Sequence, residues 1–257
     1  MLKERPILFS GPMVRAILDG LKTQTRRVSR TQPSSSRFTV GHYHPTMIDR
    51  HGNEQPGPEV FGAYDEDGEW GIPCPYGGPG DRLWVRETWR TGKSLDALNT
   101  TAMEKLCVDA GYTHPWAPLL YMADGTSTND DTLLDFGSEW GRTRQSIYMP
   151  RWASRITLEV TDVRYERLQE ITEKDATAEG IKRISKDGGT TWKWGLPDRD
   201  GLPGIDDDGM PWTDWDVDAR VAFRNLWDRI NGKRPGCSYG ANPYVWAVSF
   251  KRIEMTL

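Results

Sequence analysis

The sequence has no long apolar run, and this absence excludes membrane-spanning proteins. Its 257 residues are 37% hydrophobic and 27% charged, a composition typical of a soluble globular protein. No stretch approaches the roughly 20 apolar residues that a spanning helix needs. The apolar segment near the start is too short for a signal peptide. We therefore expect a cytoplasmic protein without a membrane partner, formed by one domain over residues 1–257.

Cysteine is scarce, and several catalytic signatures are missing. Cys74, Cys107 and Cys237 stand far apart, which indicates reduced thiols rather than a disulfide framework. The chain contains no G-x-S-x-G, H-E-x-x-H or G-x-x-x-x-G-K-[ST] motif. The serine-hydrolase, zincin and P-loop classes therefore lose most of their support.

Metal-binding patterns are weak as well. His42, His44, His51 and Cys74 are residue types that zinc prefers, but they lie in a loop-like region and their spacing matches no standard site. The aspartate cluster at 206–208 lacks a glycine at the sixth position of a calcium loop. We therefore expect no metal and no cofactor, and interpret these residues as surface or hydrogen-bonded polar groups.

Tryptophan and unevenly distributed charge are what the sequence has in plenty. Twelve tryptophans are present, and most tryptophans fill a core. Residues 1–37 carry eight Lys or Arg against two acids, whereas residues 196–218 carry eight Asp against one Arg, within a net charge of −4. This distribution argues against an evenly basic nucleic-acid protein. It favours a local anion- or nucleotide-binding patch near the N-terminus.

Periodicity predicts many strands with helices scattered between them. Strands are predicted at 6–9, 82–89, 154–168 (long enough to hold a bend) and 243–253, with a hairpin over 60–72 that turns at Asp67-Gly68. Helices are predicted at 10–20, 171–181 and 214–232. Little periodicity marks two probable insertions, a packed segment at 91–145 and a long surface loop at 185–212. The pattern favours an α+β fold with a small closed or half-closed barrel.

The densest chemical signal is DGLKTQTRRV, residues 19–28. A lysine after a helix end can simply complement the helix dipole. In an extended chain, Lys22 and Thr25 would face opposite sides, so they converge only if the chain bends at Thr23 or Gln24. Lysine beside a threonine hydroxyl can activate a weak nucleophile when burial lowers the amine pKa. The segment is therefore either a solvated basic turn or the edge of a pocket.

Four segments resemble, in family order, the ASCH-domain proteins of the PUA-like superfamily. GLKTQTRR (20–27) is similar to their G-[RK]-K-T-x-[TE]-x-R run, and PGDRLWVRE (79–87) to their G-D-x-L-x-V strand. LQEITEKDATAEGI (168–181) resembles their helix with an acidic end, and NPYVWAVSFKRI (242–253) their closing strand. The chain looks like the larger phage and prophage members. The resemblance implies an α+β, PUA-like β-barrel with flanking helices and two insertions.

The resemblance also implies a chemistry. The small bacterial enzymes of this superfamily are amidohydrolases that remove acetate from N4-acetylcytidine. Carried over by motif, their lysine, threonine and glutamate correspond to Lys22, Thr25 and Glu179. Thr25 would attack the acyl carbon or position a water, Lys22 would take the proton, and Glu179 would relay one to the leaving nitrogen. Alternatively, Glu179 is the base for water and Lys22 stabilises the oxyanion.

The competing interpretation is a binding module without catalysis, because PUA-like barrels commonly bind RNA or a flipped-out modified base. Arg26, Arg27 and Arg30 would then clamp phosphates, and Trp84 or Trp89 would stack on bases. A nuclease has less support, since no carboxylate cluster suited to metal-dependent cleavage stands out. A phage protein that acts on host factors through its insertions is the remaining alternative. The partner is expected to be a modified nucleoside or a nucleic acid, and the sequence leaves the oligomeric state open.

Overall fold

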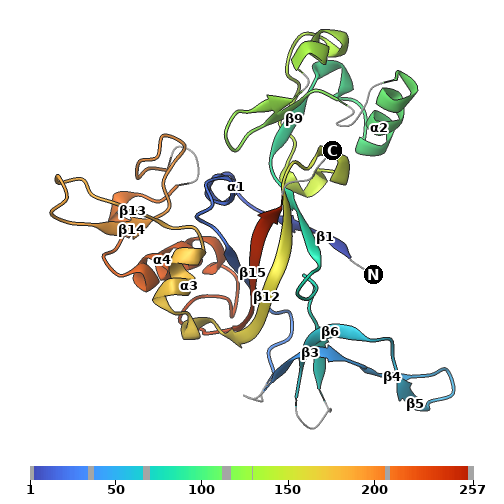
Figure 1. Cartoon of the computed structure of the whole chain (residues 1–257), viewed down its shortest axis with the longest axis vertical. Coiled ribbons are helices and arrows are strands. Elements are labelled where there is room, and N and C mark those ends of the chain that lie inside the picture. Colours follow the sequence, from blue (N-terminus) through green and yellow to red (C-terminus); the bar gives the residue numbers. More distant parts are fainter. Residues whose placement is uncertain are drawn as a thin grey trace.

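The centre of the molecule is a five-stranded sheet with the order β1-β8-β12-β15-β2 (Figure 1). The computed structural model describes residues 3–33, 38–65, 70–111, 117–128, 130–205 and 209–253. β1 runs parallel to β8, and the remaining neighbours are antiparallel. The sheet therefore joins strands from both ends of the chain: β1 (Glu4–Leu8), β2 (Gln24–Val28), β8 (Arg82–Arg86), β12 (Thr157–Arg167) and β15 (Tyr244–Ile253).

The described residues have a mixed α+β fold, as predicted, but no closed barrel is found among them. β1 and β2 are the two edges of the central sheet and do not pair with each other. A barrel closes only when its edge strands are joined by backbone hydrogen bonds. Here a side chain links the edges, since Arg27 Nη2 donates to the Leu8 carbonyl oxygen at 2.6 Å.

Three helices lie where the sequence predicted them, one of them with a shifted start, and a fourth lies within 91–145, where the sequence predicted no helix. The four α-helices of the described residues are α1 (Gly11–Leu18), α2 (Thr100–Asp109), α3 (Glu173–Ala178) and α4 (Ala219–Asn231). α4 starts five residues later than predicted because Asp218 caps it by accepting from the Arg220 amide. Before this cap, Asp216 pairs with Trp194. α3 has the predicted capping pair, since Thr172 and Asp175 exchange hydrogen bonds.

The long strand β12 is bent, as the sequence suggested. Its register against β15 shifts between Val160 and Asp162, the mark of a β-bulge. The main core packs around this pair of strands and includes Trp215, Trp227 and Trp246. Among the tryptophans that the structure describes, six are buried, which agrees with a core role for many of them.

The segment predicted as one strand over 82–89 is in fact two strands in two sheets. β8 ends at Arg86, and β9 (Trp89–Thr91) pairs with β10 (Leu119–Tyr121), which pairs with β11 (Ser127–Thr128). Between them, Glu87 is buried against Arg155, with Oε1 and Nε 2.8 Å apart. Trp89 then belongs to a second hydrophobic core that also holds Met103, Leu119 and Trp152. The predicted insertion is therefore built around a core of its own (upper part of Figure 1).

Two regions expected as loops contain strands. The loop-like region around His42 holds β3 (Thr39–Tyr43), β4 (Thr46–Ile48) and β5 (Glu54–Pro56), because short strands in local hairpins leave little periodicity. β3 pairs with β6 (Val60–Tyr64), which pairs with β7 (Gly71–Pro73) as the predicted hairpin; its turn at Asp67-Gly68 lies outside the described residues. Within 185–212, β14 (Lys193–Gly195) pairs with β13 (Lys182–Ile184).

Short 3₁₀ helices complete the description. They span Lys93–Leu95, Asp130–Phe136, Ser146–Tyr148, Arg151–Ala153, Leu168–Glu170 and Trp212–Asp214. No helix of the described residues has the length and apolarity to cross a membrane. The three cysteines are free and buried, in keeping with the predicted reduced thiols.

Candidate functional site

Lys22 takes its position from the end of helix α1. Gly20 adopts a φ of +74°, and its amide donates to the Ile17 carbonyl at 3.1 Å. The Leu21 amide donates to the Ala16 carbonyl at 2.9 Å. These two bonds form a Schellman motif, so the helix stops at a glycine as predicted. The Lys22 amide also donates to the Ala16 carbonyl, which fixes the lysine beside the helix end.

Regular strand structure is interrupted between Lys22 and strand β2. Lys22 forms an isolated antiparallel bridge with Glu179, the C-cap residue of α3. Thr23 lies outside any strand, and β2 begins only at Gln24. The break falls where the sequence required a bend for Lys22 and Thr25 to face one space.

The side chains of Lys22 and Glu179 are in direct contact, although 157 positions separate them in the chain. Lys22 Nζ donates to Glu179 Oε2 and to the Glu179 carbonyl oxygen, both at 2.8 Å. The two side chains are only 1% and 5% exposed. The next residue, Gly180, has a φ of +97°, and a Cβ there would lie 2.8 Å from Lys22 Cβ. A glycine at this position therefore permits the close approach of the lysine.

Burial lowers the pKa of Lys22, because an ammonium group loses its hydration in the interior. The charge and hydrogen bond of Glu179 oppose this shift, whereas the charges of Arg27 and Arg26 add to it. The net direction is downward, so the neutral amine is populated at lower pH than on an exposed lysine. A neutral amine can accept a proton, which an ammonium cannot do.

Arg26 is buried behind this pair among three carboxylates. Its guanidinium is 0% exposed and lies 2.7 Å from Glu166 Oε1, 3.3 Å from Asp175 Oδ2 and 3.4 Å from Glu179 Oε1. It also donates to the side chain of Gln24. The sequence suggested Arg26 as a phosphate clamp, but its two terminal nitrogens contact side chains of the protein, and only its Nε has no hydrogen-bond partner among the described residues. In this arrangement Arg26 orients Glu179 and stabilises its charge.

Thr25 lines the same cavity as Lys22 and Glu179. It is 3% exposed and pairs with Val248 of β15. The cavity has a volume of about 420 Å³, within the range of small-molecule sites. Its walls come from β2, the start of α1, the end of α3 and one face of α4; besides the three predicted catalytic residues they include Phe9, Arg27, Arg30, Tyr76, Trp227 and Arg234.

Two further predicted arginines lie at this cavity. Arg27 is partly buried over the ring of Phe9, 5.1 Å from its centroid. Arg30 is exposed at the cavity wall. Both can meet an anionic group on a ligand in the cavity.

The tryptophans suggested as stacking surfaces are placed differently. Trp89 is 0% exposed inside the second core, and Trp84 is 8% exposed beneath the guanidinium of Arg86, 4.6 Å from the ring centroid. Neither ring is open to a base, and neither lines the cavity of Lys22. Trp84 lies on β8 and Trp89 on β9, in two different sheets, a break that the periodicity of 82–89 did not reveal.

Sequence reasoning missed the part of the site that α4 supplies. Trp227 and Arg234 line the cavity from α4 and the segment after it. The spacing of Phe223, Trp227 and Ile230 on one helix face was the available signal, but an apolar stripe is more often a core face than a pocket wall. Tyr76, from the loop before β8, had no signal. Burial raises its pKa, while Arg27 and Arg30 oppose that shift.

The suspected metal ligands do not gather. Among the residues that the structure describes, no group of three or more His, Cys, Asp and Glu side chains is arranged to hold a metal. His42 packs against Phe61, with ring centroids 5.3 Å apart, and His44 Nδ1 lies 3.0 Å from the Gly57 carbonyl oxygen. The aspartates 206–208 lie outside the described residues.

Comparison of this chain with protein-family models, with curated proteins and with solved structures gives no match. The site itself combines a buried lysine, a carboxylate, a threonine and peripheral arginines around one cavity.

Proposed function

We propose that this protein is an amidohydrolase that removes the acyl group from an N-acylated nucleobase such as N4-acetylcytosine, in the cavity of Lys22, Thr25 and Glu179. One observation carries the proposal. A buried lysine with a lowered pKa is held 2.8 Å from a buried carboxylate, and Thr25 lines the same cavity. Acid–base hydrolysis of an amide needs these three kinds of group.

The proposed reaction proceeds in two steps. Neutral Lys22 takes the proton of the Thr25 hydroxyl, whose oxygen attacks the acyl carbon and forms a tetrahedral oxyanion near Arg27. Collapse of this tetrahedral intermediate breaks the carbon–nitrogen bond, and the proton held by Lys22 reaches the leaving amine by way of Glu179. Water then hydrolyses the Thr25 ester, which releases a carboxylate and restores the hydroxyl. The alternative in which Glu179 activates water and charged Lys22 holds the oxyanion uses the same residues.

A nucleobase suits the composition of the cavity. The half-buried Tyr76 offers aromatic surface to a planar ring, and Arg30 and Arg234 add positive charge for a phosphate or ribose-linked oxygen; the buried rings of Phe9 and Trp227 also line the cavity. The half-open five-stranded sheet, bridged at its edges by Arg27, supports an open PUA-like barrel of the ASCH type as the underlying fold.

A binding module that retains the modified base without hydrolysis is the second candidate. The cluster of Arg27, Arg30 and Arg234 around the cavity favours it, because cations around an aromatic-lined pocket suffice for recognition of a nucleotide. In that case the pair of Lys22 and Glu179 would only hydrogen-bond the base.

Turnover of N4-acetylcytidine and of other N-acylated nucleosides tests the proposal. We expect the wild type to release acetate and Lys22→Met to lose about 10²–10⁴-fold in kcat/KM, the usual contribution of a general base. Lys174→Met, which removes an exposed lysine of α3, is the matched control and should retain wild-type turnover. Tight binding of these nucleosides without any turnover by the wild type would instead favour the binding module.

A further inference from the structure

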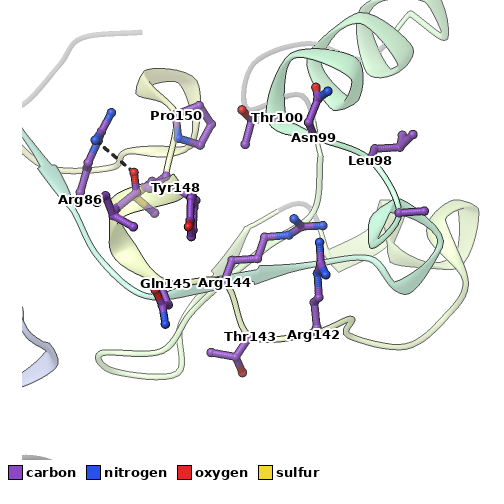
Figure 2. A pocket seen from close by; sticks show the side chains of 13 residues that line it. Arg86, Leu98, Asn99, Thr100, Arg142, Thr143, Arg144, Gln145, Tyr148 and Pro150 are labelled. Carbon is purple, nitrogen blue, oxygen red and sulfur yellow. Dashed lines mark hydrogen bonds between the residues drawn. The ribbon is translucent and has the colours of Figure 1, made fainter.

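A second cavity, of about 820 Å³, lies where the insertion meets strand β8 (Figure 2). Its walls come from Arg86 at the end of β8, from Asn99 and Thr100 at the start of α2, and from the segment 142–150. Arg86, Arg142 and Arg144 line it, and none of its described lining residues is acidic. The cavity is thus a concentration of positive charge outside the site of Lys22.

Two of these arginines are held close together. Arg144 has a side chain only 8% exposed; Nη2 donates to the Leu95 carbonyl at 2.9 Å and lies 3.5 Å from Asp96 Oδ1. Its Nε has no hydrogen-bond partner among the described residues. Burial lowers the pKa of Arg144, and the charge of Arg142 lowers it further. Figure 2 shows both side chains entering the cavity from the side opposite Asn99. An anion between them would relieve this repulsion.

The third arginine and a tyrosine complete the surface. Arg86 donates to the Ile147 carbonyl at 3.1 Å, and its Nε also has no hydrogen-bond partner among the described residues. Tyr148, beside it on the cavity wall, is 67% exposed. An exposed aromatic ring next to several guanidinium groups matches the way proteins hold single strands, with bases stacked and phosphates neutralised.

Residues of the two cavities lie on neighbouring strands at one edge of the central sheet. Leu8 lines the cavity of Lys22 and is the register partner of Arg86 in the parallel pairing of β1 with β8. Partner residues on neighbouring strands are about 5 Å apart and face the same side. Arg27 reaches the Leu8 carbonyl from the other side. Positive side chains therefore continue from the first cavity, across the sheet edge, into the second.

We propose that the second cavity binds the sugar–phosphate backbone of a single-stranded nucleic acid whose acylated base occupies the cavity of Lys22. This inference rests on the proposed function and deepens it, since it makes the substrate a polymer instead of a free nucleoside. A free nucleoside would leave the second cavity unused. A strand is the kind of ligand that fills both, because its phosphates recur along the line of Arg27, Arg86 and Arg142.

Binding of short single-stranded RNA and DNA of the same sequence, measured by fluorescence anisotropy over a range of salt, tests the inference. Arg142 is exposed, so Arg142→Ala should fold. We expect it to weaken binding and to reduce the slope of log K against log salt by about 0.7. Tyr148→Ala should weaken binding roughly tenfold. Arg50→Ala is the control, because it removes an exposed arginine from the β4–β5 turn at the opposite end of the molecule (Figure 1); it should change affinity less than twofold.

Equal losses in Arg50→Ala and Arg142→Ala, or an unchanged salt slope, would overturn the inference. Tighter binding of the RNA oligomer than of the DNA oligomer would identify RNA as the polymer that carries the acylated base. Turnover separates the two proposals. Arg142→Ala and Tyr148→Ala should deacylate a free nucleoside at the wild-type rate but an acylated oligomer with a raised KM. If the wild type deacylates nucleosides and gains nothing from an oligomer, only this inference fails. If oligomers bind as expected and no substrate is turned over, only the proposed function fails.

Discussion

Arg26 supports the site through its contact with the carboxylate of Glu179. Three carboxylates converge on its guanidinium, and one of them belongs to Glu179. Burial raises the pKa of Asp175, but hydrogen bonds from Thr172 and the charges of Arg26 and Arg164 outweigh it and lower that pKa to about 2. Asp175 is therefore held in its charged form by Thr172 and by two arginines.

We expect Arg26→Met to destabilise the protein by about 3–5 kcal/mol, because it removes the fully buried cation that contacts all three carboxylates. Arg164→Met is the matched control. Arg164 contacts Glu166 and Asp175 too, but its side chain is 38% exposed, so its loss should cost about 1 kcal/mol or less. Urea unfolding at neutral pH measures both variants, and equal losses would refute the assignment of Arg26 as the central cation.

Unfolding at acidic pH gives a second comparison of the variants Arg26→Met and Arg164→Met. A carboxyl group with a lowered pKa contributes stability above its ordinary pKa of 3.8, and this contribution disappears as the pH falls toward 2. The stability gap between Arg26→Met and Arg164→Met should therefore narrow below pH 4.

Single residues also show how much of the site the sequence predicted. The order Gly20, Lys22, Thr25 and the acidic helix end was visible in the sequence, and the side chains of Lys22, Thr25 and Glu179 do line one cavity. The burial of Arg26 was not readable, because its partners come from β12 and α3, more than 130 positions away. Side-chain partners at such distances follow from the tertiary fold and leave no local pattern.

At the scale of elements, the site depends on how closely the end of α3 approaches the end of α1. A Cβ at Gly180 would meet both Lys22 Cβ at 2.8 Å and Ala16 Cβ at 3.0 Å. The glycine is thus needed for its positive φ and also for space. A comparison with Gly188 separates these two requirements, because Gly188 has a positive φ but no close neighbour.

Gly180→Ala should lower the free energy of unfolding by at least about 1 kcal/mol more than Gly188→Ala. Gly188 also has a positive φ of +70°, but nothing lies within 4 Å of its would-be Cβ, so its substitution reports the backbone strain alone. Chemical denaturation of both variants gives the comparison. The displaced Lys22 should also reduce deacylation in Gly180→Ala and leave it unchanged in Gly188→Ala. Equal destabilisation by the two substitutions would mean that the helix ends are not tightly packed.

Elements were predicted well where a cap or a run of strand-forming residues marked them. α1, α3 and β15 agree with their predicted positions to within a few residues because Gly20, Thr172 and a ten-residue run rich in aromatic and β-branched side chains define them. The strand break at Glu87 was missed, since a chain that crosses between sheets keeps its alternating pattern. The strands of 39–56 were missed because segments of three to five residues carry too little periodicity.

At the scale of the whole molecule, the site exists only because the chain returns to its beginning. β15 pairs with β2, and α3 delivers Glu179 to Lys22 across 157 positions. The insertion adds a separate core and a second, arginine-lined cavity at the edge of the same sheet. The general α+β character followed from the sequence, whereas the open sheet could not, because strand order and edge pairing are properties of the complete fold.

The central claim is that neutral Lys22 accepts the proton during amide hydrolysis, and the pH dependence of kcat/KM tests it most directly. Activity should rise with pH as Lys22 loses its proton, at a pH below the ordinary lysine value of 10.5 because burial lowers this pKa. Glu179 raises the pKa of Lys22 through its charge and hydrogen bond.

Replacing the carboxylate in Glu179→Gln should therefore move the rising limb of the remaining activity to lower pH. A limb that stays in place or moves to higher pH would contradict the account.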